Sequence, residues 1–274
     1  MEGIGYMELS IIILTYKSKN LVRFVLKDLL NSDLPDQTEI IVVDNDSEDN
    51  IREMIEKKYP QVRFIQSGKN IGFAGGNNVG IRAAFGKYVL IMNPDIFVQD
   101  NSIQKLYNYI KERENENIGL VAPRLNNPDG SLQHTAYRFH KWSTPIYRRT
   151  FLGKTEKGKK HLKEFVMSDW DHNSTKEVDW VQGSCFISPK KLLEDINYFD
   201  EQYFMYMEDM DLCRKMNLAG KKVIYYPETQ AIHLHRKESA EGSWHQVFTN
   251  KLTRIHIHSW LKYMWKFRKA GRNL

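Results

Sequence analysis

Three short apolar runs, separated by stretches of helical character, constrain the fold of this chain more than any other feature. They cover residues 9–14, 39–43 and 88–92 and are rich in Ile and Val. They are too short for buried helices and are apolar apart from Ser10 and Glu39, which indicates strands buried on both faces. Strands that alternate with helices at this spacing predict a parallel sheet with right-handed crossovers, and hence an α/β fold.

Two of these runs end in a carboxylate at the same edge of the predicted sheet. Asp44 follows the second run, and Asn93-Pro94-Asp95 follows the third. Ligands of open α/β sheets bind outside the carboxyl ends of the strands, so Asp95 is placed to hold a cation or a polar ligand. The alternative is a plain turn, because Asn, Pro and Asp all favour turns.

A glycine-rich segment, Asn70-Ile71-Gly72-Phe73-Ala74-Gly75-Gly76-Asn77-Asn78, precedes a predicted helix. Glycines before a helix suit a phosphate that is held by backbone N–H groups at the helix N-terminus. The segment contains no G-x-G-x-x-G and is not followed by Gly-Lys-Ser/Thr, so it is neither a dinucleotide-binding fingerprint nor a P-loop. The alternative is that the glycines only allow the helix to pack closely on the sheet.

Composition limits the partners and the compartment. A formal net charge of +6 and a pI near 9.0 favour anionic partners, such as nucleotide phosphates, nucleic acid or an acidic membrane surface. Cys185 and Cys213 give no disulfide framework, and residues 1–4 lack the pattern of a signal peptide. No apolar run approaches the roughly 20 residues that span a bilayer. We therefore expect a cytoplasmic protein whose only membrane contact would be peripheral.

The order of these motifs resembles the family 2 glycosyltransferases of GT-A fold, and most closely their bacterial rhamnosyltransferase-like members. The motifs that carry the resemblance are Thr15-Tyr16, Val43-Asp44-Asn45, the Asn70 to Asn77 segment and Asn93-Pro94-Asp95. This family implies nucleotide-sugar and saccharide partners and no nucleic acid.

The resemblance also implies a division of the chain. A GT-A domain, with a Rossmann-like and mostly parallel sheet flanked by helices, is expected over residues 1–239. Its donor half covers about 9–125 and its acceptor half about 126–239. A basic, amphipathic helical segment is expected over 240–274 as a C-terminal extension.

By this resemblance, the donor half binds a nucleotide sugar and a divalent cation, Mg²⁺ or Mn²⁺. Asn93-Pro94-Asp95 stands at the position of the family's D-x-D motif, which binds the cation on the donor diphosphate. Because Asn93 is neutral and a poorer ligand, we expect Asp95 to be the main metal ligand. The nucleotide-sugar-binding residues that the resemblance implies are Thr15, Tyr16, Asp44, Asn70, Gly72, Phe73, Asn77, Asn93 and Asp95.

The acceptor half carries two further motifs. Asp179-Trp180-Val181-x-Gly183 resembles the segment that starts the family's acceptor half and implies acceptor contacts by Trp180 and Gly183, although core packing is equally open for Trp180. Glu208-Asp209-Met210-Asp211 opens a predicted helix, where acids also complement the helix dipole. In the family, Glu-Asp at a helix start is catalytic. Asp209 is then the general base, and Glu208 and Asp211 order the acceptor and the neighbouring charges.

Two histidines and two basic stretches complete the prediction. His233 and His235 lie two residues apart in an extended segment, so either is a candidate metal ligand or simply a packed or surface residue. Residues 141–163 are basic and without periodicity, which indicates a mobile loop or a solvated face. The stretch from Gly242 to Leu274 has no acid and shows helical spacing, which favours either an anionic membrane surface or packing on protein.

The sequence therefore predicts an inverting, metal-dependent glycosyltransferase that moves one sugar to a glycan or a polyprenyl-diphosphate-linked saccharide. The resemblance suggests dTDP-rhamnose or a UDP-sugar as donor, in cell-surface polysaccharide synthesis. The absence of Gln-x-x-Arg-Trp argues against a processive synthase. The alternatives are a nucleotidyltransferase that makes the activated sugar, and a non-catalytic glycan-binding protein with a degenerate site.

Overall fold

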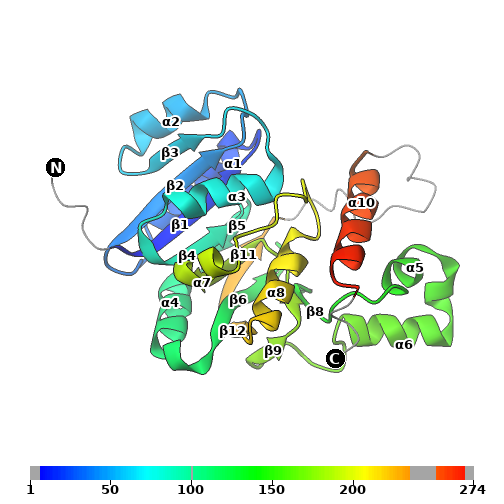
Figure 1. Cartoon of the computed structure of the whole chain (residues 1–274). Helices are drawn as coiled ribbons and strands as arrows, with labels where there is room; N and C mark the ends of the chain where they lie inside the picture. The colour runs from blue at the N-terminus through cyan, green and yellow to red at the C-terminus, as the bar shows by residue number, and fades with distance from the viewer. Residues whose placement is uncertain (1–6, 100, 235–250, 269–274) are drawn as a thin grey trace.

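A ten-stranded mixed sheet runs through the centre of the molecule (Figure 1). The computed structural model describes residues 7–99, 101–234 and 251–268. The strands are β1 (Met7–Thr15), β2 (Thr38–Asp44), β3 (Arg63–Gln66), β4 (Gly86–Met92), β5 (Ile96–Val98), β6 (Ile118–Asn126), β7 (Leu132–Gln133), β9 (Lys176–Val178), β11 (Cys185–Pro189) and β12 (Lys222–His233), with β8 (Ala136–Tyr137) and β10 (Trp180–Val181) in a separate pair.

Helices cover both faces of this sheet and form a side wall next to it (Figure 1). They are α1 (Lys19–Leu30), α2 (Ile51–Lys58), α3 (Gly72–Ala83), α4 (Ser102–Glu112), α5 (Thr144–Arg149), α6 (Glu156–Phe165), α7 (Lys190–Asp195), α8 (Glu208–Leu218) and α10 (Lys251–Lys266), with short 3₁₀ turns η1 (Glu114–Glu116) and η2 (Phe151–Lys154).

The strands that carry the predicted motifs are parallel neighbours. The order is β3-β2-β1-β4, and β11 then lies antiparallel between β4 and β6, while β12 runs parallel to β6. The expected α/β architecture is confirmed, with β11 as an antiparallel insertion at the centre. The sheet is continuous across the expected donor and acceptor halves, so the division near residue 126 stays a prediction.

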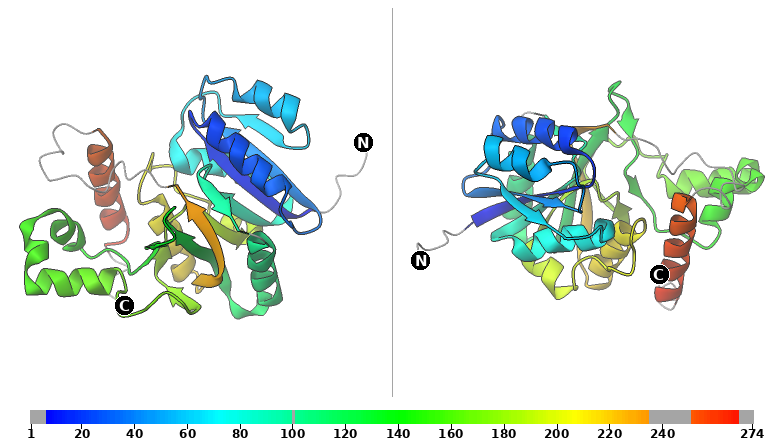
Figure 2. Two further views of the ribbon diagram at one scale, coloured as in Figure 1. Left: turned by 180° about the vertical axis from the view of Figure 1, so that it is seen from behind. Right: turned by 90° about the horizontal axis from the view of Figure 1, so that it is seen from above.

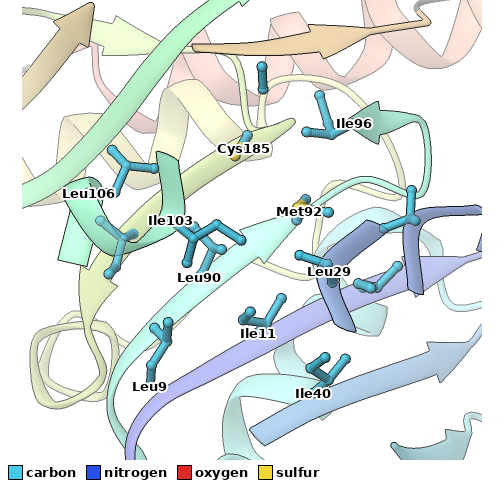
Figure 3. Packing of buried hydrophobic residues seen from close by; sticks show 14 of the residues in the cluster. Leu9, Ile11, Leu29, Ile40, Leu90, Met92, Ile96, Ile103, Leu106 and Cys185 are labelled. Carbon is cyan, nitrogen blue, oxygen red and sulfur yellow. The ribbon is translucent and has the colours of Figure 1, made fainter. Parts of the chain in front are cut away.

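The central strands are largely apolar because they separate two cores. Along β1, Ile11 and Ile13 face one core, whereas Ile12 and Leu14 face the other. Helices α1, α2 and α4 cover the first core, and α3, α7 and α8 cover the second. Figure 3 shows the first core, where the side chains of Ile11 and Leu29 lie between β1 and α1.

Of the two alternatives for the basic stretch over residues 141–163, the mobile loop is wrong, whereas a solvated face agrees with its mostly exposed side chains. It forms α5, η2 and most of α6, and Phe165 at the end of α6 is buried. The periodicity was hidden because these helices are short and present few apolar residues to the core. Thr155 starts α6 as a side-chain cap, accepting a hydrogen bond from the Gly158 N–H at 3.1 Å.

Helix α10 packs on the domain next to α8. Tyr263 and Met264 are buried against Tyr203, Met207 and Met210. Figure 2 shows α10 beside α5 and α6, in the helical side wall. Of the two alternatives for the basic tail, packing on protein is therefore realised over residues 251–268. None of the helices in the described ranges is long and apolar enough to cross a membrane.

An enclosed ion pair fastens α10 to α8. Lys266 Nζ lies 2.7 and 2.9 Å from the two carboxylate oxygens of Asp211 and 2.6 Å from Asp200 Oδ2. The Tyr203 hydroxyl also donates to Asp211 at 3.1 Å. The Asp211 side chain has no exposed surface, and burial raises its pKa in spite of the attraction of Lys266. Asp211 is therefore a docking point for α10.

We expect Lys266→Met to lower the free energy of unfolding by about 3 kcal/mol at neutral pH, because it removes the nearest cation of the buried Asp211 carboxylate and leaves only Lys215, at 4.0 Å. Burial already raises the pKa of Asp211, and removal of Lys266 raises it further, so the loss should shrink on acidification as Asp211 takes up a proton. Urea unfolding at neutral and acidic pH measures both effects. Lys262→Met is the control, since Lys262 only donates to the Gln202 carbonyl. Equal losses in the two variants would contradict the role of the ion pair.

Candidate active site

The carboxyl ends of β1 and β2 form the first part of the candidate site. Thr15 and Asp44 are paired in register, and the Asn45 N–H donates to the Thr15 carbonyl at 2.8 Å. The Asp44 carboxylate is buried and accepts hydrogen bonds from the backbone N–H and the hydroxyl of Ser47. Asp44 is thus held rigidly at the sheet edge. Tyr16, the next residue after Thr15, is 45% exposed and free to lie along a ligand.

Asn45 connects this edge to the glycine-rich segment. Its amide nitrogen donates to Asn70 Oδ1 at 3.1 Å and to the Gly72 carbonyl at 3.0 Å, and its oxygen accepts from the Ile71 N–H at 3.1 Å. Asn70 in turn accepts from the Gly72 N–H at 3.0 Å. A buried amide that makes all these bonds fixes the start of α3 against the ends of β1 and β2.

Gly72 allows the loop before α8 to approach this point. Its φ is +77°, and a Cβ at this position would lie 2.1 Å from the Phe204 carbonyl oxygen. That carbonyl accepts a hydrogen bond from the Phe73 N–H at 2.9 Å. Only glycine satisfies both conditions, so the donor-side helix and the acceptor-side loop meet by direct backbone contact.

The other glycines of the segment serve packing of the helix on the sheet. A Cβ on Gly76 would lie 2.3 Å from Leu14, and one on Gly80 would lie 2.5 Å from Ile12. Asn77 is buried in α3, where its amide donates to the Phe73 carbonyl at 3.0 Å. Of the two alternatives for this segment, close helix packing is what the structure shows for Gly76 and Gly80.

The end of β4 brings Asp95 next to His233. The Asn93 N–H donates to the Ser184 carbonyl at 2.8 Å, which ties this turn to the start of β11. Asp95 Oδ1 lies 3.4 Å from Nε2 of His233, and the Leu234 N–H donates to the Asp95 carbonyl at 3.0 Å. The side chain of Asp95 is 22% exposed, whereas that of His233 is almost fully buried. His235 lies outside the described residues.

The chemistry of the Asp95 and His233 side chains fits a divalent cation. Nδ1 of His233 lies 2.8 Å from the Gln133 side-chain oxygen, and in the tautomer with the proton on Nδ1 the Nε2 atom has the lone pair with which a histidine binds a metal. Such a second-shell bond is typical of histidine ligands. Within the described residues, no group of three or more His, Cys, Asp or Glu side chains surrounds a common point. A cation here would take its remaining ligands from a substrate diphosphate and water, as Mg²⁺ commonly does.

The start of α8 supplies the acid pair. Asp209 Oδ2 accepts from the Gly183 N–H at 3.1 Å, and its Oδ1 accepts from the Met210 N–H at 2.7 Å. Burial raises the pKa of Asp209, and these two backbone bonds oppose the rise. A carboxylate with a raised pKa and a fixed orientation is a suitable general base. Gly183 is close-packed here, since a Cβ on it would lie 3.1 Å from the Asp209 Cβ.

Glu208 is the more strongly perturbed acid of the pair. It is buried, and Oε2 has no hydrogen-bond partner among the described residues. Burial raises its pKa well above the ordinary value, and the neighbouring Asp209 charge adds to the rise. Burial and the Asp209 charge thus both favour the protonated form of Glu208. Two adjacent carboxyl groups with separated pKa values are characteristic of catalytic sites.

The remaining acceptor-side predictions have different outcomes. Trp180 is partly buried, donates from Nε1 to the Arg138 carbonyl at 2.9 Å and stacks on Tyr137 at 4.8 Å, so its ring is largely used in packing.

The prediction that Asp211 orders the acceptor does not fit its surroundings. Its carboxylate is enclosed by Lys266 and Tyr203 and is not exposed to a ligand. Residues two positions apart on a helix point to different faces, so Asp211 does not share the face of Asp209 although the two are close in sequence.

The predicted residues from separate parts of the chain are joined by one continuous series of contacts. Asn45 links the Thr15–Asp44 edge to Gly72, and Phe73 bonds the Phe204 loop that leads into Asp209. Asp209 bonds Gly183, and the adjacent Ser184 bonds Asn93, which precedes Asp95 and His233. The roles of these residues stay predictions, but the sites that they occupy are neighbours along one edge of the sheet.

Three residues that support this series were not predicted as site residues. Ser47 lies three positions after Asp44, a spacing typical of a side-chain-to-backbone turn, whereas Asn45 bonds residues 25 to 27 positions away. Gln133 orients His233 from β7, across 100 positions of sequence. Nothing in the sequence near Gln133 marks it, because the contact depends on the pairing of β7 with β6.

Comparison with known proteins gives the family. The family model described as glycosyl transferase family 2 matches residues 10–170, which is more than half of the chain. This range contains the ends of β1, β2 and β4 and the glycine-rich segment, but it stops before Asp209.

Curated relatives match over longer ranges. Rhamnosyltransferase WbbL of Escherichia coli is 28% identical over 264 residues, which cover 93% of this chain and 91% of the relative. The N-acetylglucosaminyl-diphospho-decaprenol L-rhamnosyltransferase of Mycobacterium tuberculosis is 27% identical over 262 residues, covering 84% of this chain and 77% of the relative. A low-salt glycan biosynthesis hexosyltransferase of Haloferax volcanii, Agl10, is 29% identical over 82% of this chain and 67% of the relative.

Solved structures agree in fold. GalNAc-T7, crystallised with UDP, GalNAc and Mn²⁺, has a TM-score of 0.62 at 13% identity over 86% of this chain. S. aureus TarS 1–349 has a TM-score of 0.58 at 19% identity over 83% of this chain. The match spans 45% of the GalNAc-T7 chain and 60% of the TarS chain, and at this identity it shows the GT-A fold alone. With the family match and the curated relatives, it follows that this chain belongs to glycosyl transferase family 2 and is a glycosyltransferase of GT-A fold.

Proposed function

We propose that this enzyme transfers one sugar from a nucleotide donor to a hydroxyl of a glycan or lipid-linked saccharide, with inversion at the anomeric carbon. The observation that carries the proposal is the contact series from Asp44 through Gly72, Phe204 and Asp209 to Asp95. It provides a nucleoside side, a diphosphate side and a base within one region of the sheet edge.

On the donor side, Thr15, Tyr16 and Asp44 are the proposed nucleoside contacts. The buried Thr15 hydroxyl has no hydrogen-bond partner among the described residues, which leaves it available to a ligand. Asn93, Asp95 and His233 are the proposed contacts of the diphosphate and its cation. When bound, Mg²⁺ or Mn²⁺ supplies Lewis-acid stabilisation of the charge that develops on the departing diphosphate.

On the acceptor side, Asp209 is the proposed general base. The Gly183 and Met210 N–H groups fix its two oxygens, so its orientation does not depend on the acceptor. Asp209 takes the proton of the acceptor hydroxyl as that oxygen attacks the anomeric carbon, and the bond to the nucleoside diphosphate breaks on the opposite face. One displacement completes the transfer and inverts the configuration.

The names of the relatives support a particular donor and acceptor. Two of them are rhamnosyltransferases, and one of these acts on a diphospho-decaprenol carrier by name. We propose dTDP-rhamnose, or failing that a UDP-sugar, as donor, and a polyprenyl-diphosphate-linked saccharide as acceptor in cell-surface polysaccharide synthesis. Exposed aromatic side chains near basic residues, Phe151 at 77% and Trp265 at 67%, support peripheral contact with an anionic membrane. The cytoplasmic face is the proposed location.

The first prediction from the proposed function distinguishes donor binding from the sugar-transfer step. In a panel of sugar nucleotides, one donor should raise the melting temperature only with Mg²⁺ or Mn²⁺ present. Asp95→Asn should lose this cation-dependent stabilisation, because it removes the charged ligand of the cation. Asp209→Asn should keep it and lose transfer by about 10²–10⁴-fold, the usual contribution of a general base. The two variants serve as controls for each other, and loss of donor binding in Asp209→Asn would contradict the assignment.

The second prediction concerns the neutral state of Glu208. Its pKa is raised in the folded protein, so the stability contributed by its protonated form is present at low pH and is lost as pH rises through the folded pKa. Glu208→Gln cannot ionise, and its melting temperature relative to wild type should therefore rise between about pH 5 and about pH 9.

Thermal denaturation across this pH range measures the difference. Glu56→Gln is the matched control, because Glu56 lies exposed on α2. If the melting temperatures of Glu208→Gln and wild type differ by the same amount at every pH, the raised pKa of Glu208 is contradicted.

A further inference from the structure

A groove of about 1350 Å³ lies in the helical side wall, among α6, α8, α10 and the segment that follows β8. It is separate from the contact series described above, since neither Asp44, Asp95 nor Asp209 lines it. Eight Lys or Arg residues line it against four Asp or Glu residues. This excess of positive charge makes the groove suited to an anionic ligand.

Arg214 is the most informative of these cations. It is only 8% exposed, and it makes no hydrogen bond or ion pair with any residue in the described ranges. Its guanidinium lies 4.4 Å from the ring centroid of Phe139 and 6.0 Å from that of Phe267. Aromatic rings stabilise a cation partially but leave its N–H donors without acceptors. A buried guanidinium with unused donors is suited to a bidentate anion such as phosphate.

A second buried polar group lines the same groove. His140 is 8% exposed, and neither of its ring nitrogens has a hydrogen-bond partner among the described residues. Burial lowers its pKa to about 3, and the nearby Arg148 charge acts in the same direction. His140 is therefore neutral at ordinary pH and offers one donor and one acceptor to a ligand. Buried polar groups in proteins normally have a hydrogen-bond partner, so these two ring nitrogens are candidates to bind a ligand.

Aromatic side chains form part of the groove wall. Trp142, Tyr263 and Phe267 line it, and Trp142 is 55% exposed. An inorganic ion alone would leave these walls in water. The cationic donor of Arg214, the neutral His140 and the aromatic side chains together match an amphiphile that has a phosphate head and a hydrocarbon chain.

The groove adjoins the proposed acceptor side through the segment after β8. Tyr137 of β8 is close enough to Asp209 for that charge to contribute to its raised pKa. Tyr137 also stacks on Trp180, whose ring lies 6.3 Å from His140. The same segment thus borders the base on one side and the groove on the other.

We propose that this groove binds the diphosphate and the first isoprenoid units of a lipid-linked acceptor, with Arg214 holding the diphosphate. The inference rests on the proposed transfer to a lipid-linked saccharide and adds the site where the carrier is recognised. It gives the enzyme a way to select acceptors by their carrier, at a site distinct from that of the donor diphosphate.

The test is calorimetric titration of the full chain with farnesyl diphosphate, in excess nucleoside diphosphate and Mg²⁺ so that the donor side is occupied. Farnesol and inorganic pyrophosphate are titrated as the apolar and the anionic half of the probe. Farnesyl diphosphate should bind at least tenfold more tightly than either half. Arg214→Met should weaken its binding by tenfold or more, and Arg214→Lys by less, because lysine keeps the charge but loses the planar fork.

A matched pair of surface variants covers the case in which Arg214→Met does not fold. Lys163 and Lys157 are both exposed on α6, but only Lys163 lines the groove. Lys163→Glu should weaken farnesyl diphosphate binding several-fold more than Lys157→Glu, although both change the net charge equally.

Three results would overturn the inference: pyrophosphate binding as tightly as farnesyl diphosphate, farnesol binding as tightly, or equal effects of the two α6 variants. These results are independent of the proposed function. If donor binding and transfer to a soluble saccharide persist while farnesyl diphosphate fails to bind, only the carrier site is wrong. If no sugar nucleotide binds while farnesyl diphosphate does, the proposed donor is wrong, but the proposed carrier site in the groove is supported.

Discussion

The structure depends on one backbone contact, where the carbonyl of Phe204 meets the start of α3. The Phe73 N–H bonds this carbonyl at 2.9 Å, and Gly72 provides the space because it has no side chain. The contact joins the helix that follows β3 to the loop that leads into α8. Through it, the acid pair of Glu208 and Asp209 acquires a fixed position relative to the ends of β1 and β2. A sheet of parallel strands places ligands at one edge, and this contact brings the base to the same edge.

Buried acids at that position carry an energetic cost that the fold offsets locally. Asp209 is stabilised as a carboxylate by the Gly183 and Met210 N–H groups, which compensate in part for lost hydration. Glu208 has an oxygen without such a partner among the described residues, and burial raises its pKa well above the ordinary value, which favours its protonated form. The difference between the two neighbours follows from their hydrogen bonds. Asp211, only two positions further on, is stabilised by Lys266 and serves the docking of α10.

Local pattern was sufficient to predict the strands and the residues at their ends. The buried runs over 9–14, 39–43 and 88–92 form β1, β2 and β4. A parallel strand that is covered on both faces has a short and almost continuous apolar sequence, which makes it easy to recognise. Asp95 and His233 lie close together, but their role as metal ligands stays a prediction, and His235 lies outside the described residues.

Features that depend on contacts distant in sequence could not be predicted. The role of Asp211 is set by Lys266, 55 positions away, and the orientation of His233 is set by Gln133, 100 positions away. Helices α5 and α6 were not predicted because they are short and pack mainly on each other and on η2, and the start of α6 is fixed by the Thr155 cap. Arg214 likewise reads as an ordinary helix cation in sequence, and only its burial marks it as unusual.

The most direct test of the account is a crystal of the full chain grown with a nucleoside diphosphate and Mn²⁺, with anomalous scattering used to locate the metal. The account predicts an anomalous peak between Asp95 and His233, with the diphosphate on the metal and the nucleoside over Thr15 and Asp44. A metal and nucleotide bound away from these residues, for instance beside Arg214 in the helical side wall, would contradict it.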